Sequence, residues 1–197
     1  MQEIKRRITR EVRIGAVRIG GRNPVAIQSM AKTRTAAVAA TAAQILRLEQ
    51  AGCEIIRVAV KDAADARAIA ALKKRIHIPL VADIHFDWKL AIMSIESGAD
   101  KVRLNPGNIF KKDQVRAVIA AARNAHIPIR VGLNSGSVRG SGDPVRRMVS
   151  AAKEYVRGIE RLGFRDLVVS LKASDAAGTV RAYRAFSRGY DYPLHLG

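Results

Sequence analysis

The sequence predicts an α/β fold of the (β/α)8 or TIM-barrel type, truncated after about seven strands and preceded by an N-terminal β-hairpin. Short β-branched runs alternate with longer, alanine-rich amphipathic runs, which is the pattern of strands separated by helices. Each strand–helix unit takes about 20 to 40 residues, which suits parallel βα units. No glycine-rich dinucleotide fingerprint follows any strand, so a barrel is favoured over a doubly wound sheet.

The elements follow one another regularly along the chain. Two short apolar runs within residues 12–21 predict a hairpin that closes the lower end of the barrel. The predicted strands are 25–30, 54–60, 80–85, 101–105, 129–134, 167–173 and 193–196. The predicted helices are 36–51, 63–75, 88–97, 112–125, 144–162 and 176–188. Asp143 followed by Pro144 is a helix N-cap with proline at the first helical position, and helix C-caps are expected at Gly52, Gly98 and Gly163.

The sequence is expected to be one partial barrel domain spanning residues 1–197. A complete barrel of this kind needs roughly 250 residues, and the chain stops at the end of the seventh predicted strand. With 48% hydrophobic and 26% charged residues the chain is globular. No apolar run approaches the roughly 20 residues that cross a bilayer, and no signal peptide is evident, so a cytoplasmic protein is expected. Cys53, the single cysteine, excludes an internal disulfide and a cysteine-only metal site.

The chain is strongly basic, with 35 Lys and Arg against 17 Asp and Glu and a formal charge of +18. Such a balance indicates a polyanionic partner, of which nucleic acid is one. Only 5% of residues are aromatic, which leaves little surface for stacking bases, and the cations are dispersed along the chain. A non-catalytic nucleic-acid-binding domain is therefore kept as an alternative and not as the main interpretation.

Polar residues recur at the ends of the predicted strands, where the catalytic groups of such barrels lie. Because side chains alternate along a strand, these residues share the inner face. The candidate binding residues are Arg57, Asp83, His85, Arg103, Asn105, Arg130, Asn134, Lys172, Ser174 and His195. Three arginines and a lysine with one acid, Asp83, call for an anion, and arginine forks suit phosphate. The alternative is a ring of internal salt bridges; Asp83 and His85 alone do not make a metal site.

The chain resembles the 4-hydroxy-3-methylbut-2-en-1-yl diphosphate synthases, iron–sulfur enzymes of the methylerythritol phosphate route to isoprenoids. The matching segments are IQSM (27–30), LVADIHFD (80–87), NPGNI (105–109), VSLKASD (169–175) and PLHLG (193–197). They occur in the family's order along essentially the whole chain. The resemblance places the candidate residues around a cyclic diphosphate at the barrel mouth.

The resemblance implies an oxidoreductase that opens 2-C-methyl-D-erythritol 2,4-cyclodiphosphate to 4-hydroxy-3-methylbut-2-enyl diphosphate. Electrons would come from flavodoxin or ferredoxin through a 4Fe-4S cluster, and the intact enzyme would be a homodimer. The cluster domain, with its three cysteines and one glutamate, is absent from this sequence, so the chain alone is expected to be inactive. Ala31-Lys32-Thr33 and a short 138–143 loop also depart from the family pattern. A pteroate-synthase-like phosphate-binding barrel is the remaining enzymatic alternative.

Overall fold

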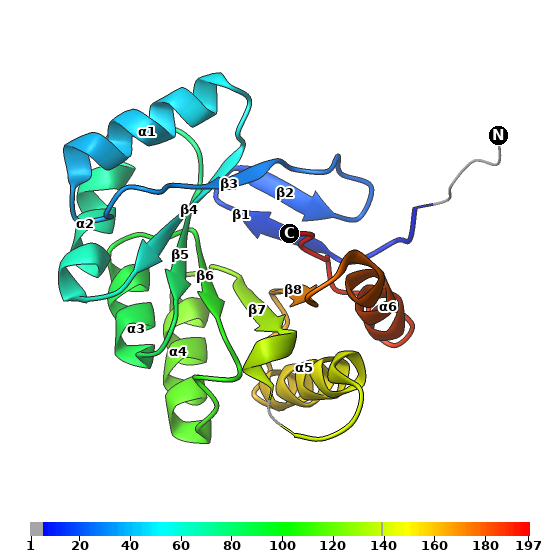
Figure 1. The fold of residues 1–197 in the computed structure, drawn as a ribbon. Helices are drawn as coiled ribbons and strands as arrows, with labels where there is room; N and C mark the ends of the chain where they lie inside the picture. Colours follow the sequence, from blue (N-terminus) through cyan, green and yellow to red (C-terminus); the bar gives the residue numbers. More distant parts are fainter. Residues whose placement is uncertain (1–5, 139) are drawn as a thin grey trace, which may run out of the picture.

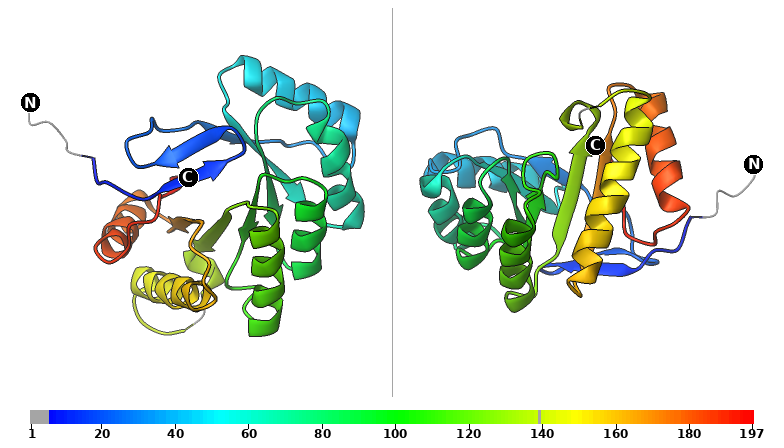
Figure 2. Two further views of the ribbon diagram at one scale, coloured as in Figure 1. Left: turned by 180° about the vertical axis from the view of Figure 1, so that it is seen from behind. Right: turned by 90° about the horizontal axis from the view of Figure 1, so that it is seen from below.

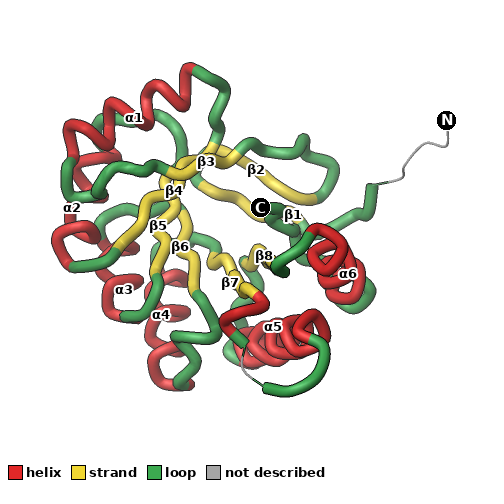
Figure 3. Tube along the Cα trace, in the orientation of Figure 1, coloured by secondary structure: helices red, strands yellow, loops and turns green. Residues whose placement is uncertain are grey.

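The computed structural model describes residues 6–138 and 140–197, and it contains a curled sheet of six parallel strands in the order β3-β4-β5-β6-β7-β8. The helices lie on the outer side of this half-barrel (Figure 1, Figure 3). The strands are β3 (Gln28–Met30), β4 (Ile55–Val60), β5 (Leu80–Ile84), β6 (Lys101–Leu104), β7 (Ile129–Asn134) and β8 (Leu167–Lys172). The helices are α1 (Val38–Gln50), α2 (Ala63–Lys73), α3 (Trp88–Glu96), α4 (Lys112–Asn124), α5 (Pro144–Arg161) and α6 (Ala176–Ser187), with a 3-10 turn η1 (Ser135–Ser137) after β7.

A separate antiparallel hairpin, β1 (Glu11–Ile14) and β2 (Val17–Gly20), covers one end of the sheet. Ile14 is buried against Ile55 and Val81, which stand at or next to the amino ends of β4 and β5. The hairpin lies crosswise to β7 and β8 in the right-hand view of Figure 2. The predicted hairpin at the lower end of the barrel is therefore confirmed, and it leaves the carboxyl ends of the strands open.

The main core fills the space between the sheet and its helices, because outward-facing strand residues such as Val58, Ile84 and Leu104 meet the apolar stripes of the helices. Aspartates fix the starts of four helices, α2, α3, α5 and α6. The predicted N-cap is confirmed, since the Asp143 carboxylate accepts from the Val145 N–H at 3.0 Å. Gly52, Gly98 and Gly163 follow their helices with φ of 93°, 91° and 73°, as expected of left-handed caps.

Two predicted strands differ from the structure. The strand expected at 25–30 is limited to β3, since the Ile27 N–H bonds the Glu54 carboxylate at 2.7 Å and the side chains of Val25 and Ile27 are exposed. The strand expected at 193–196 is only a single parallel bridge between Val169 and Leu194. The parallel sheet of the described residues therefore has six strands where seven were expected.

The segment after α6 lies beside the N-terminal segment. The Arg7 guanidinium donates to the carbonyls of Tyr190 and Tyr192, and the Arg10 N–H donates to the Asp191 carbonyl at 2.8 Å. These bonds place His195 next to the inner face of the sheet, close to β8. None of the helices in the described ranges is long and apolar enough to cross a membrane.

Candidate functional site

A single carboxylate, Asp83, organises the polar cluster inside the half-barrel. Its Oδ1 accepts from Arg103 Nη1 at 3.2 Å, and its Oδ2 lies 3.6 Å from Arg57 Nε and 3.5 Å from His85 Nε2. Asp83 is buried. Four of the predicted site residues thus come together from β4, β5, the residue after β5, and β6, with Asp83 as their shared partner.

The strand register explains why these side chains meet. Asp83 on β5 is paired with Arg103 on β6, which is paired in turn with Arg130 on β7. Residues at the same level of adjacent parallel strands point to the same side, and alternate residues along each strand return to that side. The intervening Leu104 and Val131 face the helices and are fully buried there.

Arg130 is the most isolated cation of the cluster. It is 3% exposed, and its Nε and Nη1 have no hydrogen-bond partner among the described residues. Burial, followed by repulsion from Arg57, lowers the pKa of Arg130 to about 9, so the guanidinium keeps its charge at neutral pH. A buried guanidinium without partners is costly, so this arrangement indicates a ligand that accepts hydrogen bonds and carries negative charge.

Arg103 extends the same donor surface. Its Nη2 donates to the Gly132 carbonyl at 3.0 Å and its Nη1 to Asp83, while Nε has no partner in the described structure. Gly132 makes room for this side chain, because a Cβ there would lie 2.7 Å from Arg103 Nε and 3.0 Å from Ser170 Oγ. The sequence alone did not single out this role for Gly132.

The rim of the site carries the less buried candidates. Asn134 and Lys172 are paired at the ends of β7 and β8, and both are exposed, as is Ser174 in the loop that follows. Lys172 has the same strand parity as Ser170, as predicted, but it is the last residue of β8 and its side chain is exposed. Asn105 is buried, and its Oδ1 accepts from the Gly107 N–H at 3.1 Å, which fixes the turn after β6.

His195 approaches the cluster from the C-terminal segment. Its N–H donates to the Val169 carbonyl at 2.9 Å, and its own carbonyl accepts from the Tyr183 hydroxyl. Burial, followed by repulsion from Arg130 and Lys101, lowers the pKa of His195 to about 3. The imidazole is therefore neutral at pH 7 and offers one donor and one acceptor.

Three further residues, Lys101, Gln28 and Met30, belong to this site although no role was assigned to them from the sequence. Lys101 lies two residues before Arg103 on β6 and is fully buried, with Nζ 3.3 Å from Gln28 Oε1. Arg57 Nη2 lies 3.0 Å from the sulfur of Met30. Lys101 has the same strand parity as Arg103 and Asn105, and this alternation was the signal that could have identified it.

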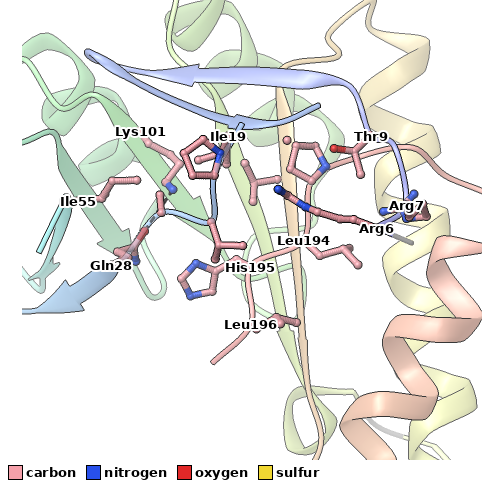
Figure 4. A pocket seen from close by; sticks show the side chains of 16 residues that line it. Arg6, Arg7, Thr9, Ile19, Gln28, Ile55, Lys101, Leu194, His195 and Leu196 are labelled. Atoms are coloured by element: carbon pink, nitrogen blue, oxygen red, sulfur yellow. Dashed lines mark hydrogen bonds between the residues drawn. The ribbon is translucent and has the colours of Figure 1, made fainter. Parts of the chain in front are cut away.

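A cavity of about 390 Å³ lies beside this cluster (Figure 4). Lys101, Gln28 and His195 line it together with residues of the hairpin and of the N-terminal segment. Figure 4 shows the side chains of these three residues near one another on its wall. Of the cationic groups inside the half-barrel, Lys101 is the one that reaches this cavity among the described residues.

The described residues do not form a metal or iron–sulfur site. No group of three or more His, Cys, Asp or Glu side chains within residues 6–138 and 140–197 is placed to hold a metal ion. Cys53, the single cysteine of the sequence, is buried, and its Sγ donates to the Ile55 carbonyl at 3.1 Å. It lies two residues before the start of β4.

The chain is similar to known proteins over nearly its whole length. A family model described as the GcpE TIM-barrel domain matches residues 9–197. The 4-hydroxy-3-methylbut-2-en-1-yl diphosphate synthase (flavodoxin) of Anoxybacillus flavithermus is 53% identical over 200 residues, which cover 98% of this chain and 55% of the relative. That of Lysinibacillus sphaericus is 53% identical over 195 residues, covering 96% and 53%. The chain spans about half the length of the curated relatives it matches.

Solved structures with a similar fold include several dihydropteroate synthases. The enzyme of Xanthomonas albilineans matches with a TM-score of 0.69 at 14% identity, covering 94% of this chain and 77% of that one. The enzyme of Yersinia pestis matches with a TM-score of 0.65 at 15% identity, covering 93% and 74%. At these identities the likeness shows the barrel-type fold alone.

Proposed function

We propose a function for this chain from one premise: it belongs to the GcpE TIM-barrel domain family. On this proposal, residues 1–197 form the substrate-binding barrel domain of a 4-hydroxy-3-methylbut-2-en-1-yl diphosphate synthase. The substrate is the cyclic diphosphate 2-C-methyl-D-erythritol 2,4-cyclodiphosphate, and the whole protein is an oxidoreductase. The names of the relatives give flavodoxin as the electron donor, and we extend that partner to the whole protein in which this barrel acts.

The observation that carries the proposal is the buried, partly unpartnered donor surface of Arg130 and Arg103. Three guanidinium nitrogens on these two residues have no hydrogen-bond partner in the described structure, and one carboxylate, Asp83, serves the cluster. A diphosphate supplies both the missing acceptors and the missing negative charge. Internal salt bridges alone, the alternative left open by the sequence, do not satisfy these groups.

The residues of this chain take distinct roles in binding. Arg130 and Arg103 donate to the phosphate oxygens from the inner face, while Asp83 holds Arg57 and Arg103 in place through its two oxygens. Lys172 and Asn134 at the rim cover the ligand from the ends of β7 and β8. The same fixed cations stabilise the charge that develops on a diphosphate oxygen when its bond to carbon breaks.

The iron–sulfur cluster implied by the family does not fit the residues of this chain. The sequence has one cysteine, and the described residues hold no cluster of metal-ligating side chains. We therefore assign binding and orientation of the substrate to this barrel, and derive no redox step from its residues. The cluster and its ligands belong, on this proposal, to a domain of the whole protein outside residues 1–197.

Titration calorimetry with pyrophosphate and with the cyclic diphosphate tests the proposal. Replacing Arg130 by Ala removes a fork of charge-assisted hydrogen bonds, and we expect binding to weaken by about 1.5 to 3 kcal/mol. Arg116→Ala removes an exposed arginine of α4 and serves as the matched control, with little effect expected. Equal losses in both variants would mean diffuse attraction to a basic surface, and would contradict a specific diphosphate site.

A further inference from the structure

Lys101 is a buried cation for which the proposed binding role of the arginines does not account. It is 1% exposed and lies at the start of β6, at the same level as Val81 of β5 and one inward-facing position below Arg103. Its one side-chain hydrogen bond among the described residues is to Gln28 Oε1, at 3.3 Å across the half-barrel. An amide oxygen neutralises no charge, so the ammonium has no counter-ion at this distance.

The charged and titratable groups around Lys101 are mostly cations. Arg57 of β4 and Arg130 of β7 both repel its ammonium, and the neutral His195 faces it from the C-terminal segment. Arg6 and Arg7 of the N-terminal segment lie on the same cavity, where Arg7 is tied to the carbonyls of Tyr190 and Tyr192. Asp83, the nearby carboxylate of β5, is already shared by Arg57 and Arg103. Lys101 therefore has positive neighbours and no acid of its own.

Burial of Lys101 and repulsion by its cationic neighbours both favour the neutral amine over the ammonium. Burial, followed by the charges of Arg130 and Arg57, lowers the pKa of Lys101 to about 7. The side chain is thus close to the point at which it releases its proton under neutral conditions. The adjoining cavity of about 390 Å³ has room for water molecules, which exchange protons with the amine.

We propose that Lys101 is a positioning residue of the anion site, which takes up a proton from the buffered solvent when a diphosphate binds to Arg103 and Arg130. The lone pair of the amine nitrogen forms an N–H bond with a proton released by the buffer acid, which is left as its conjugate base, and no bond between heavy atoms changes. The ammonium repels the guanidinium groups of Arg57 and Arg130, and so favours an arrangement in which the anion lies among these charges. This inference rests on the proposed diphosphate-binding function and deepens it by adding a proton to the bound state.

The physical basis of the proposal is linkage between the binding of the diphosphate and the binding of a proton by Lys101. A diphosphate brings negative charge near an amine that otherwise has only positive neighbours, so it favours the ammonium. Linkage is reciprocal, and the ammonium must favour the diphosphate by the same factor. A rise of about two units in the pKa of Lys101 corresponds to about a hundredfold tighter binding by the protonated form.

NMR titration of lysine labelled at Cε and Nζ measures the protonation of Lys101 directly. We use the whole 197-residue chain with and without saturating pyrophosphate, and assign the resonance by its loss in Lys101→Met. The expected midpoint is near pH 7 without ligand, and about two units higher with pyrophosphate. The ordinary midpoint of about 10.4 in the free chain would overturn the proposal.

A second measurement compares pyrophosphate affinity at pH 7 and pH 9 in Lys101→Met, in the parent chain and in Lys112→Met, an exposed control on α4. The titration of pyrophosphate itself is common to all three proteins. We expect the affinity of the parent and of the control to fall about 25-fold relative to that of Lys101→Met as the pH rises from 7 to 9.

The outcomes separate the two proposals. Pyrophosphate that binds through Arg130 but leaves the Lys101 midpoint and the pH dependence unchanged overturns the role of Lys101 alone. Pyrophosphate that does not bind, or that binds equally well to Arg130→Ala, overturns the diphosphate site and the role of Lys101 with it.

Discussion

At the scale of single residues, the site depends on one carboxylate among several cations. Asp83 contacts Arg57, Arg103 and His85, while Arg130 keeps two nitrogens without partners in the described chain. A purely structural cluster would pair its charges, because a buried unpaired charge destabilises the fold. The imbalance therefore supports the proposed binding site, because functional sites often keep charges that the fold alone does not balance.

His195 gives the protein a predictable response to acid. Its pKa in the folded chain is lowered to about 3 by burial and by Arg130, Lys101 and Arg57, against about 6.5 when unfolded. Between these values the unfolded chain binds one more proton than the folded chain, so stability falls as the pH drops below about 6.5.

We expect the unfolding free energy of the parent to fall relative to that of His195→Gln by up to about 1.4 kcal/mol for each pH unit below 6.5. Urea unfolding of both proteins at pH 7 and pH 5 measures this difference. A constant difference between the two pH values would show that the imidazole titrates normally in the folded chain.

Substitution of Gly132 tests the space around Arg103, and substitution of Gly158 serves as the control. A Cβ on Gly132 would lie 2.7 Å from Arg103 Nε, whereas a Cβ on Gly158, within α5, meets nothing within 4 Å. We expect Gly132→Ala to displace Arg103 and to weaken pyrophosphate binding about tenfold or more. Gly158→Ala should leave binding unchanged and raise stability by about 1 kcal/mol through helix propensity. Calorimetry and urea unfolding measure both effects, and unchanged binding in Gly132→Ala would contradict the geometry assigned to Arg103.

At the scale of elements, hydrophobic alternation predicted the helices and most strands to within a few residues, because each βα unit buries one face of its strand against its own helix. It failed at 193–196, since Leu194 forms one bridge to Val169 and no ladder. Strand parity correctly grouped Asp83, Arg57 and Arg103. Strand parity also places Lys101 on the inner face with Arg103. How deeply its side chain is buried depends on the neighbouring strands, and the sequence of β6 alone does not show this.

The hairpin contributes to stability by covering the amino end of the sheet. Ile14 is fully buried with Ile55 and Val81, while Ile8, just before the hairpin, is 69% exposed. We expect Ile14→Ala to lower the unfolding free energy by about 2 to 5 kcal/mol, through lost burial and the cavity left behind. Ile8→Ala is the control and should change stability by less than about 0.5 kcal/mol. Similar small effects in both variants, measured by urea unfolding, would mean that the hairpin does not pack on the sheet.

At the scale of the whole molecule, the half-barrel has one covered end and one open end. The hairpin covers the amino ends of the strands, and Asn134 and Lys172 stand at the carboxyl ends of β7 and β8. This polarity is that of barrel enzymes, which bind substrates at the carboxyl ends of their strands. The formal charge of +18 also raises the local concentration of any anionic ligand, but it does not select one.

A crystal structure of the chain with pyrophosphate tests the central claim most directly, because it shows where a diphosphate settles on a strongly basic molecule. We predict one well-ordered pyrophosphate inside the half-barrel, with oxygens about 2.7 to 3.1 Å from Arg130 Nη1 and Arg103 Nε. Pyrophosphate bound only on the outer helices, with the Arg130 nitrogens still without partners, would contradict the account.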